Sequence, residues 1–97
     1  MTNRKWLPGS RDIFLDARAL ARVVSKKLRQ HGTREQTALR ELQGMFHALK
    51  QAMIMPQTKE DMAYAQHELA TTYNQFVTHC YLTAERLKRN HSPSLDA

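Results

Sequence analysis

Apolar residues recur along this chain at intervals of three and four, the spacing that places side chains on one face of an α-helix. The interval holds in three stretches and predicts helices over residues 10–31, 33–55 and 58–90. The apolar positions are Ile13, Phe14, Ala17, Leu20, Val24 and Leu28 in the first stretch; Ala38, Leu39, Leu42, Met45, Phe46, Leu49, Ala52 and Met53 in the second; and Met62, Ala65, Leu69, Tyr73, Phe76, Cys80, Ala84 and Leu87 in the third. The pattern predicts an all-α fold whose three helices share one apolar core.

Residues that start and stop helices mark the junction between the first two predicted helices. Ser10 is a good N-cap for the first helix, and Gly32 tolerates the left-handed conformation in which many helices end. The segment 33–36 fits a capping box, in which the Thr33 hydroxyl and the Gln36 side chain bond free backbone N–H groups. The first connection is therefore expected to be about one residue long.

The second connection is also expected to be short. Pro56 stops the second helix at about Met55, because proline lacks an N–H group and crowds the preceding turn. Thr58 and the acidic residues that follow it cap the third helix, where the helix dipole favours negative charge. Short connections place consecutive helices side by side in opposite directions. We therefore expect an up-down-up antiparallel three-helix bundle.

The expected domain organisation has three parts. Residues 1–9 form an N-terminal arm, residues 10–90 form a single three-helix domain, and residues 91–97 form a flexible tail. At ~1.5 Å per residue the first two helices span ~33 Å each and the third ~50 Å. The third helix is thus expected to extend two or three turns beyond the other two, with Tyr81, Leu82 and Leu87 on the extension. Such an extension suggests a partner, and we expect a homodimer, with another protein as the alternative. The residues predicted at that interface are Tyr64, Tyr81, Leu82 and Leu87.

Charge is distributed unevenly along the chain. The net charge is +6, but residues 1–40 carry +7, residues 41–85 carry −3 and the rest +2. Five cationic residues on the first predicted helix recur at steps of seven, four, four and three: Arg11, Arg18, Arg22, Lys26 and Arg29. Those steps keep all five side chains on one side of the helix, roughly opposite its apolar positions. This segregation predicts a polyanion, most simply nucleic acid, or an acidic protein as the partner.

The N-terminal arm adds candidate contacts to the same partner. Arg4 and Lys5 are cationic, and Trp6 either stacks on a base or folds back over the helices, the latter being favoured before the Pro8-Gly9 turn. A first helix of about 22 residues followed by a tight connection does not match a helix-turn-helix. We therefore expect contacts to phosphates, which position a protein without reading sequence.

The composition excludes several kinds of chemistry. The single cysteine, Cys80, rules out an internal disulfide and fits a reducing compartment, either cytoplasmic or nuclear. The chain lacks the ~20-residue apolar run that a membrane span needs. The five histidines show no pair at metal-binding helical spacing, and three glycines do not build a phosphate-binding loop. We expect a non-catalytic protein without a cofactor or a metal.

The segment 46–52 suggests a different function. His47 is followed three residues later by Lys50, and the segment resembles the motif of histidine-phosphotransfer domains, which are helical bundles with an exposed phosphorylatable histidine. The resemblance implies that His47 carries a phosphoryl group and meets a receiver partner. Those domains usually have glycine directly after the lysine, where this chain has Gln51.

Arg86 and His91 have the R-x4-H spacing of HEPN-type ribonucleases. The resemblance implies a nuclease, but that family fold needs four or five helices. Cationic residues near a helix C-terminus also complement the helix dipole without any chemistry. The sequence therefore favours an accessory or regulatory protein that binds a polyanion or acidic partner through its first helix. A protein-protein adaptor or inhibitor that uses the third helix is the alternative, and phosphotransfer through His47 is a lesser one.

Overall fold

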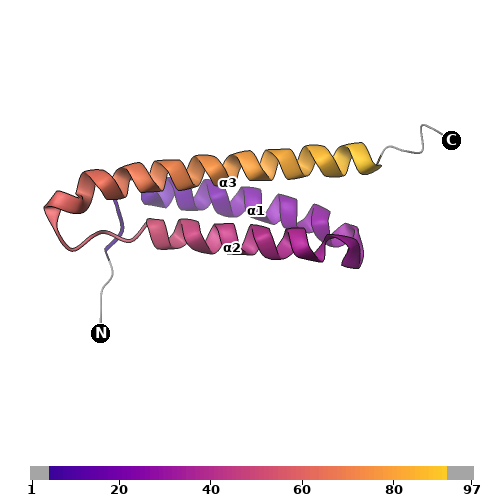
Figure 1. The fold of residues 1–97 in the computed structure, drawn as a ribbon, viewed down its shortest axis with the longest axis horizontal. Helices are drawn as coiled ribbons and strands as arrows, with labels where there is room; N and C mark the ends of the chain where they lie inside the picture. Colours follow the sequence, from indigo (N-terminus) through magenta and orange to yellow (C-terminus); the bar gives the residue numbers. More distant parts are fainter. Residues whose placement is uncertain (1–4, 92–97) are drawn as a thin grey trace.

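The computed structural model describes residues 5–91, with only the backbone described for residues 90 and 91. The fold is all-α with three helices (Figure 1): α1 (Ser10–Gln30), α2 (Gln36–Ala52) and α3 (Met62–His91). Two short 3-10 helices, η1 (Gly32–Glu35) and η2 (Lys59–Asp61), precede α2 and α3. Over these residues there is no β-strand, only an isolated bridge between residues 6 and 54. The predicted all-α three-helix fold is confirmed.

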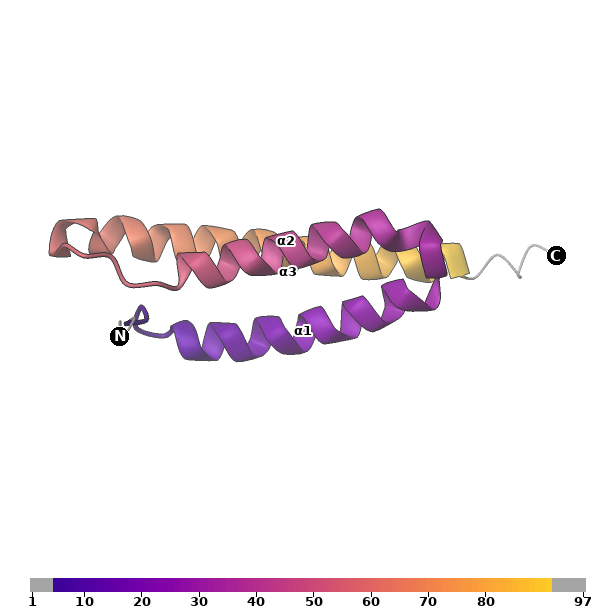
Figure 2. The same ribbon diagram turned by 90° about the horizontal axis from the view of Figure 1, so that it is seen from below.

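The three helices lie side by side in an elongated molecule of 60 × 26 × 19 Å, and each packs against the other two (Figures 1 and 2). α3 is the longest, with 30 residues. It extends beyond α1 and α2 at its beginning, on the side of the N-terminal arm (Figure 1). Near its other end, Arg86 bonds Glu35 in η1, so that part of α3 lies beside the other helices. The prediction placed the extension there, at residues 81–87, and is wrong in that respect.

The core draws on all three helices and on the N-terminal arm. Its fully buried apolar residues are Leu7, Ala17, Val24, Leu28, Leu42, Leu49, Met53, Leu69, Phe76, Cys80 and Leu87. Apart from Leu7, every one of them occupies a position that the apolar spacing predicted. The spacing identified the buried faces because each helix is continuous, so that its 3.6-residue period holds from end to end.

Three phenylalanines, one from each helix, form two contacting pairs. The ring centroids of Phe14 and Phe46 are 5.8 Å apart with an interplanar angle of 29°. Those of Phe46 and Phe76 are 5.9 Å apart with an angle of 42°. Offset and tilted arrangements at these separations are favourable for aromatic rings, so the row of rings links α1, α2 and α3.

Two predicted helix caps are wrong. The N-cap of α1 is Gly9, with φ +82°, and Ser10 is the first helical residue, buried and making no capping hydrogen bond. No capping box forms at Thr33, because residues 32–35 make a 3-10 turn and the N-cap of α2, Glu35, has no side-chain cap. The expected left-handed residue after α1 is confirmed, since Gly32 has φ +66°.

α2 ends at Ala52 rather than near Met55, because the residues after it pair with the N-terminal arm. The Leu7 N–H donates to the Met53 carbonyl and the Met55 N–H donates to the Lys5 carbonyl, each at 2.8 Å. Leu7 itself is 2 % exposed and belongs to the core. Residues 5–9 of the predicted arm are therefore fixed to the α2–α3 connection, which takes up the residues that the prediction gave to α2.

The start of α3 resembles the prediction more closely. Thr58 has the extended conformation of an N-cap and precedes η2, which leads directly into α3. Its hydroxyl donates to the Asp61 carboxylate at 2.6 Å instead of bonding a backbone N–H. The predicted tail over residues 91–97 lies outside the described residues except for the helical backbone of His91, and so does Arg4. Within the described residues, no helix combines the length and the apolar character that a membrane span requires.

Candidate functional site

The five predicted cations of α1 are all exposed. We call them the cationic stripe: Arg11, Arg18, Arg22, Lys26 and Arg29. The helix that carries them is unbroken from Ser10 to Gln30, so their sequence spacing becomes a spatial row along its outer face. The opposite face of α1, with Ala17, Val24 and Leu28, is buried.

No carboxylate within the described part of the chain neutralises the cationic stripe. None of its five side chains forms an ion pair or a side-chain hydrogen bond with another residue between 5 and 91. The acids of α1, Asp12 and Asp16, fall about 100° or more around the helix from Arg11. Burial and then the negative charge of Asp16 raise the pKa of Tyr73, which places Asp16 toward α3. Among residues 5–91 the stripe therefore presents positive charge to solvent without a carboxylate partner.

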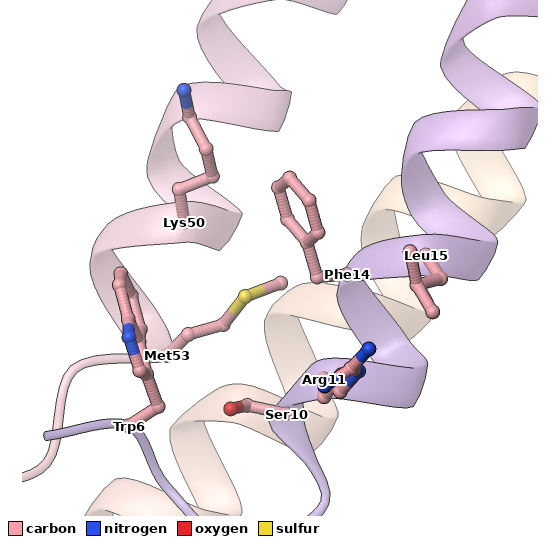
Figure 3. A pocket seen from close by; sticks show the side chains of 7 residues that line it. All are labelled: Trp6, Ser10, Arg11, Phe14, Leu15, Lys50 and Met53. Carbon is pink, nitrogen blue, oxygen red and sulfur yellow. The ribbon is translucent and has the colours of Figure 1, made fainter.

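The arm contributes less than the sequence suggested. Lys5 is exposed, and its carbonyl accepts the hydrogen bond from Met55. Arg4, the other predicted contact, lies outside the described residues. Trp6 turns back toward α2, the arrangement that the sequence favoured, but 54 % of the residue remains exposed (Figure 3).

A pocket that the sequence did not reveal adjoins the cationic stripe. It has a volume of about 570 Å³ and lies between the arm, α1 and α2 (Figure 3). Seven residues line it, four apolar, two cationic and one serine: Trp6, Phe14, Leu15, Met53, Arg11, Lys50 and Ser10. Figure 3 shows Met53 reaching from α2 toward Phe14, with Trp6 beside α2. One residue in the sequence could have indicated this pocket. Leu15 is apolar but lies between Arg11 and Arg18 on the face of α1 that carries the cationic stripe, and it is 47 % exposed.

The predicted interface on α3 is only partly at the surface. Tyr64, Tyr81 and Leu82 are 67 %, 63 % and 64 % exposed. Leu87 is 3 % exposed and packs in the core, so its assignment to a surface contact is wrong. The apolar repeat of α3 also predicted Leu87 in the core, and this second prediction is the correct one.

His47 is exposed on α2, as the phosphotransfer resemblance requires. The ammonium of Lys50 lies 5.5 Å from the centroid of the Phe46 ring, a cation–π arrangement, and the same residue lines the pocket. The lysine of the motif is thus already engaged within α2. Phosphotransfer stays a prediction from the sequence.

Arg86 has a structural partner in the hairpin turn. Two hydrogen bonds join its guanidinium to the Glu35 carboxylate: Nη1 to Oε2 at 2.8 Å and Nη2 to Oε1 at 2.9 Å. The hydrogen bond from Arg86, together with the charges of Arg86, His31 and Arg34, lowers the pKa of Glu35. The contact explains Arg86 without the nuclease chemistry that its spacing to His91 resembles.

Between residues 5 and 91, the Cys, His, Asp and Glu side chains are too dispersed to hold a metal ion. In the part of the chain that the structure describes, no three His, Cys, Asp or Glu side chains come together in a metal-binding group. Cys80 is a free, buried thiol, and its burial raises its pKa to about 11. A thiol in that state packs as a small apolar residue.

The cationic stripe and the adjoining pocket form a continuous surface at one side of α1, since Arg11 belongs to both. The apolar residues exposed on α3 form a second, separate candidate surface. Comparisons of the chain with known protein families, with curated proteins and with solved structures find no match.

Proposed function

We propose that this chain is a small, non-catalytic accessory or regulatory protein that binds nucleic acid through the cationic stripe of α1. The observation that carries the proposal is the row of five exposed cations, none of which has a carboxylate partner between residues 5 and 91. Cations that are not neutralised within the protein attract a polyanion, and binding releases the counterions condensed on its phosphates.

The dimensions of the stripe suit a nucleic-acid backbone. From Arg11 to Arg29 the helix rises ~27 Å, at ~1.5 Å per residue. A stacked strand rises ~3.4 Å per nucleotide, so the stripe spans about eight nucleotides. α1 has 21 residues and leads into a four-residue 3-10 turn, which differs from the short helices and open turn of a helix-turn-helix. Contacts of this kind hold the backbone and carry little sequence preference.

The test is a titration of labelled duplex and single-stranded oligonucleotides at two salt concentrations. If all five cations contact phosphates of a duplex, the affinity falls about 500-fold between about 50 and 200 mM salt. The triple variant Arg18→Glu, Arg22→Glu, Arg29→Glu should abolish binding. A matched variant, Lys27→Glu, Arg40→Glu, Lys59→Glu, changes the net charge equally at exposed cations outside the stripe and should retain most of the affinity.

Three results would overturn the proposal. One is binding that does not depend on salt, and another is binding that survives the stripe triple variant. The third is equal loss in both triple variants, which would assign the affinity to net charge rather than to the stripe. If the chain binds an acidic polypeptide such as polyglutamate and binds neither oligonucleotide, the partner of the stripe is an acidic protein rather than nucleic acid.

The second candidate function is protein docking on α3, either of another protein or of a second copy. It is favoured by the exposure of Tyr64, Tyr81 and Leu82 on one helix. Sedimentation of the Leu82→Asp variant measures it: a homodimer should dissociate while oligonucleotide affinity stays unchanged. A wild-type chain that sediments as a monomer at all concentrations rules the homodimer out.

We also propose the up-down-up order of the helices and a reducing compartment for the protein. Two contacts support antiparallel neighbours: Glu35 with Arg86 at one end of the molecule, and Leu7 with Met53 at the other. A free thiol at Cys80 supports the cytoplasm or nucleus. Spin labels at Gln30 and Lys88, both exposed, should report a short distance if the order is right.

A further inference from the structure

We propose that the pocket beside Trp6 holds an unpaired base of the nucleic acid that lies along the cationic stripe. The protein would then prefer ends and single-stranded stretches to blunt duplex. This inference rests on the proposed function and adds to it the form of nucleic acid that binds best.

The pocket continues the cationic stripe. Arg11 is the first cation of the stripe and also lines the pocket. Leu15, another lining residue, is one helical turn further on, on the same face and between Arg11 and Arg18. A backbone that follows the stripe toward the start of α1 therefore brings its bases to the pocket.

The walls of the pocket suit a flat aromatic group. Trp6 is half-exposed, so part of its indole is free to stack. Phe14 provides apolar surface on the α1 side, and Met53 reaches from the α2 side toward Phe14 (Figure 3). Bases stack on aromatic side chains without regard to sequence, because every base has a π-face. The volume of about 570 Å³ lies within the range of pockets that hold small molecules, and it admits one base.

Charge at the pocket favours an anionic occupant. Arg11 and Lys50 line it, and no Asp or Glu among the described residues does. A nucleotide combines the two features that the pocket selects: an apolar ring for the walls and a phosphate for the cations. The bases of an intact duplex are paired and stacked, so only an unpaired base enters without first breaking a stack.

Three labelled DNA probes test the proposal. The first is a blunt duplex, the second is the same duplex with a short 3′ overhang of thymidines, and the third has an overhang of abasic sites that keeps the phosphates and lacks the bases. The thymidine overhang should bind about tenfold more tightly than the abasic one. Trp6 is the only tryptophan in the sequence, so its fluorescence reports the pocket directly. The thymidine overhang should quench it and the abasic overhang should not.

Variants at the pocket connect this preference to Trp6. Trp6→Ala should remove the tenfold difference and leave the affinity for blunt duplex unchanged. Trp6→Phe keeps an aromatic face and should retain most of the difference. Val23→Ala, at another exposed apolar residue of α1 outside the pocket, should change neither affinity. Circular dichroism of each variant checks that the helices are intact.

The outcomes separate this proposal from the one on which it rests. If none of the probes binds in a salt-dependent way, the proposed function fails. If all three bind equally and leave Trp6 fluorescence unchanged, binding on the stripe stands and the pocket proposal is overturned. Quenching by dodecanoate or by an acidic phenylalanine peptide, but not by the thymidine overhang, would assign the pocket to another occupant and also overturn it.

Discussion

Arg86 on α3 holds Glu35 in the turn between α1 and α2 through two parallel hydrogen bonds, although the residues are 51 positions apart in sequence. The Glu35 side chain is 14 % exposed and the Arg86 side chain 40 %. A bidentate arrangement of this kind fixes geometry better than a single ion pair. The contact fastens the hairpin turn to the C-terminal part of α3.

Replacing Glu35 by Gln should lower the free energy of unfolding at neutral pH by about 1 kcal/mol, because the charge of the bidentate pair is lost at a partly exposed site. The pKa of Glu35 is lowered in the folded protein, so its contribution is present above the ordinary carboxyl pKa and lost as pH falls through the lowered value. Urea unfolding at about pH 7 and about pH 3 measures the change. The free energy of unfolding should fall less between these pH values in Glu35→Gln than in the wild type. Glu68→Gln, at an exposed carboxylate of α3, is the control and should unfold like the wild type.

Phe76→Ala should destabilise the protein by about 3–5 kcal/mol, because it leaves a cavity where a fully buried ring contacts Phe46. Domains are stable by only about 5–15 kcal/mol, so this variant should be close to unfolding at room temperature. Thermal unfolding followed by circular dichroism measures the change. Tyr81→Ala removes an exposed ring from the same helix and should shift stability by less than about 0.5 kcal/mol.

Gly9→Ala and Gly44→Ala should change stability in opposite directions. Gly9 has φ +82°, a conformation that alanine adopts only with strain, so the variant should lose about 1 kcal/mol. Gly44 lies within α2, and a Cβ there meets no atom within 4 Å, so alanine should add about 0.5–1 kcal/mol through its helix propensity. Chemical unfolding measures both changes. Equal changes in the free energy of unfolding would contradict the left-handed conformation of Gly9.

Cys80 should resist thiol reagents in the folded protein. Its pKa is raised to about 11 by burial, so at about pH 8 only about one thiol in a thousand is the reactive thiolate. Ellman's reagent should label less than a tenth of the protein in the time that labels free cysteine completely. Denaturant should then give one equivalent per chain, whereas rapid labelling of the folded protein would show that Cys80 is not buried.

The features that could be predicted from the sequence are those that depend on the 3.6-residue period of a helix. The buried faces of all three helices and the exposure of the cationic stripe follow from the spacing of residues along single helices. Leu87 shows the same principle, because its place in the repeat predicted burial correctly and its assignment to a surface contact was wrong.

Contacts between distant segments had no such signal. The backbone hydrogen bond from Leu7 to Met53 depends on no particular side chain, so neither residue marks it. The pairing of Glu35 with Arg86 joins two of many charged residues across 51 positions. The pocket beside Trp6 follows from the first of these contacts, which folds the arm against α2. A pattern of local spacing does not contain this information.

The pairing of the arm with the α2–α3 connection also has a consequence for how the molecule opens. Leu7 and Met53 close the α1–α2 hairpin into a ring, at the end opposite η1. Moving the beginning of α1 away from the α2–α3 connection therefore requires that two backbone hydrogen bonds break, Leu7 to Met53 and Met55 to Lys5. Amide protons at Leu7 and Met55, although they lie outside any helix, should consequently exchange with solvent as slowly as those of the helices they connect.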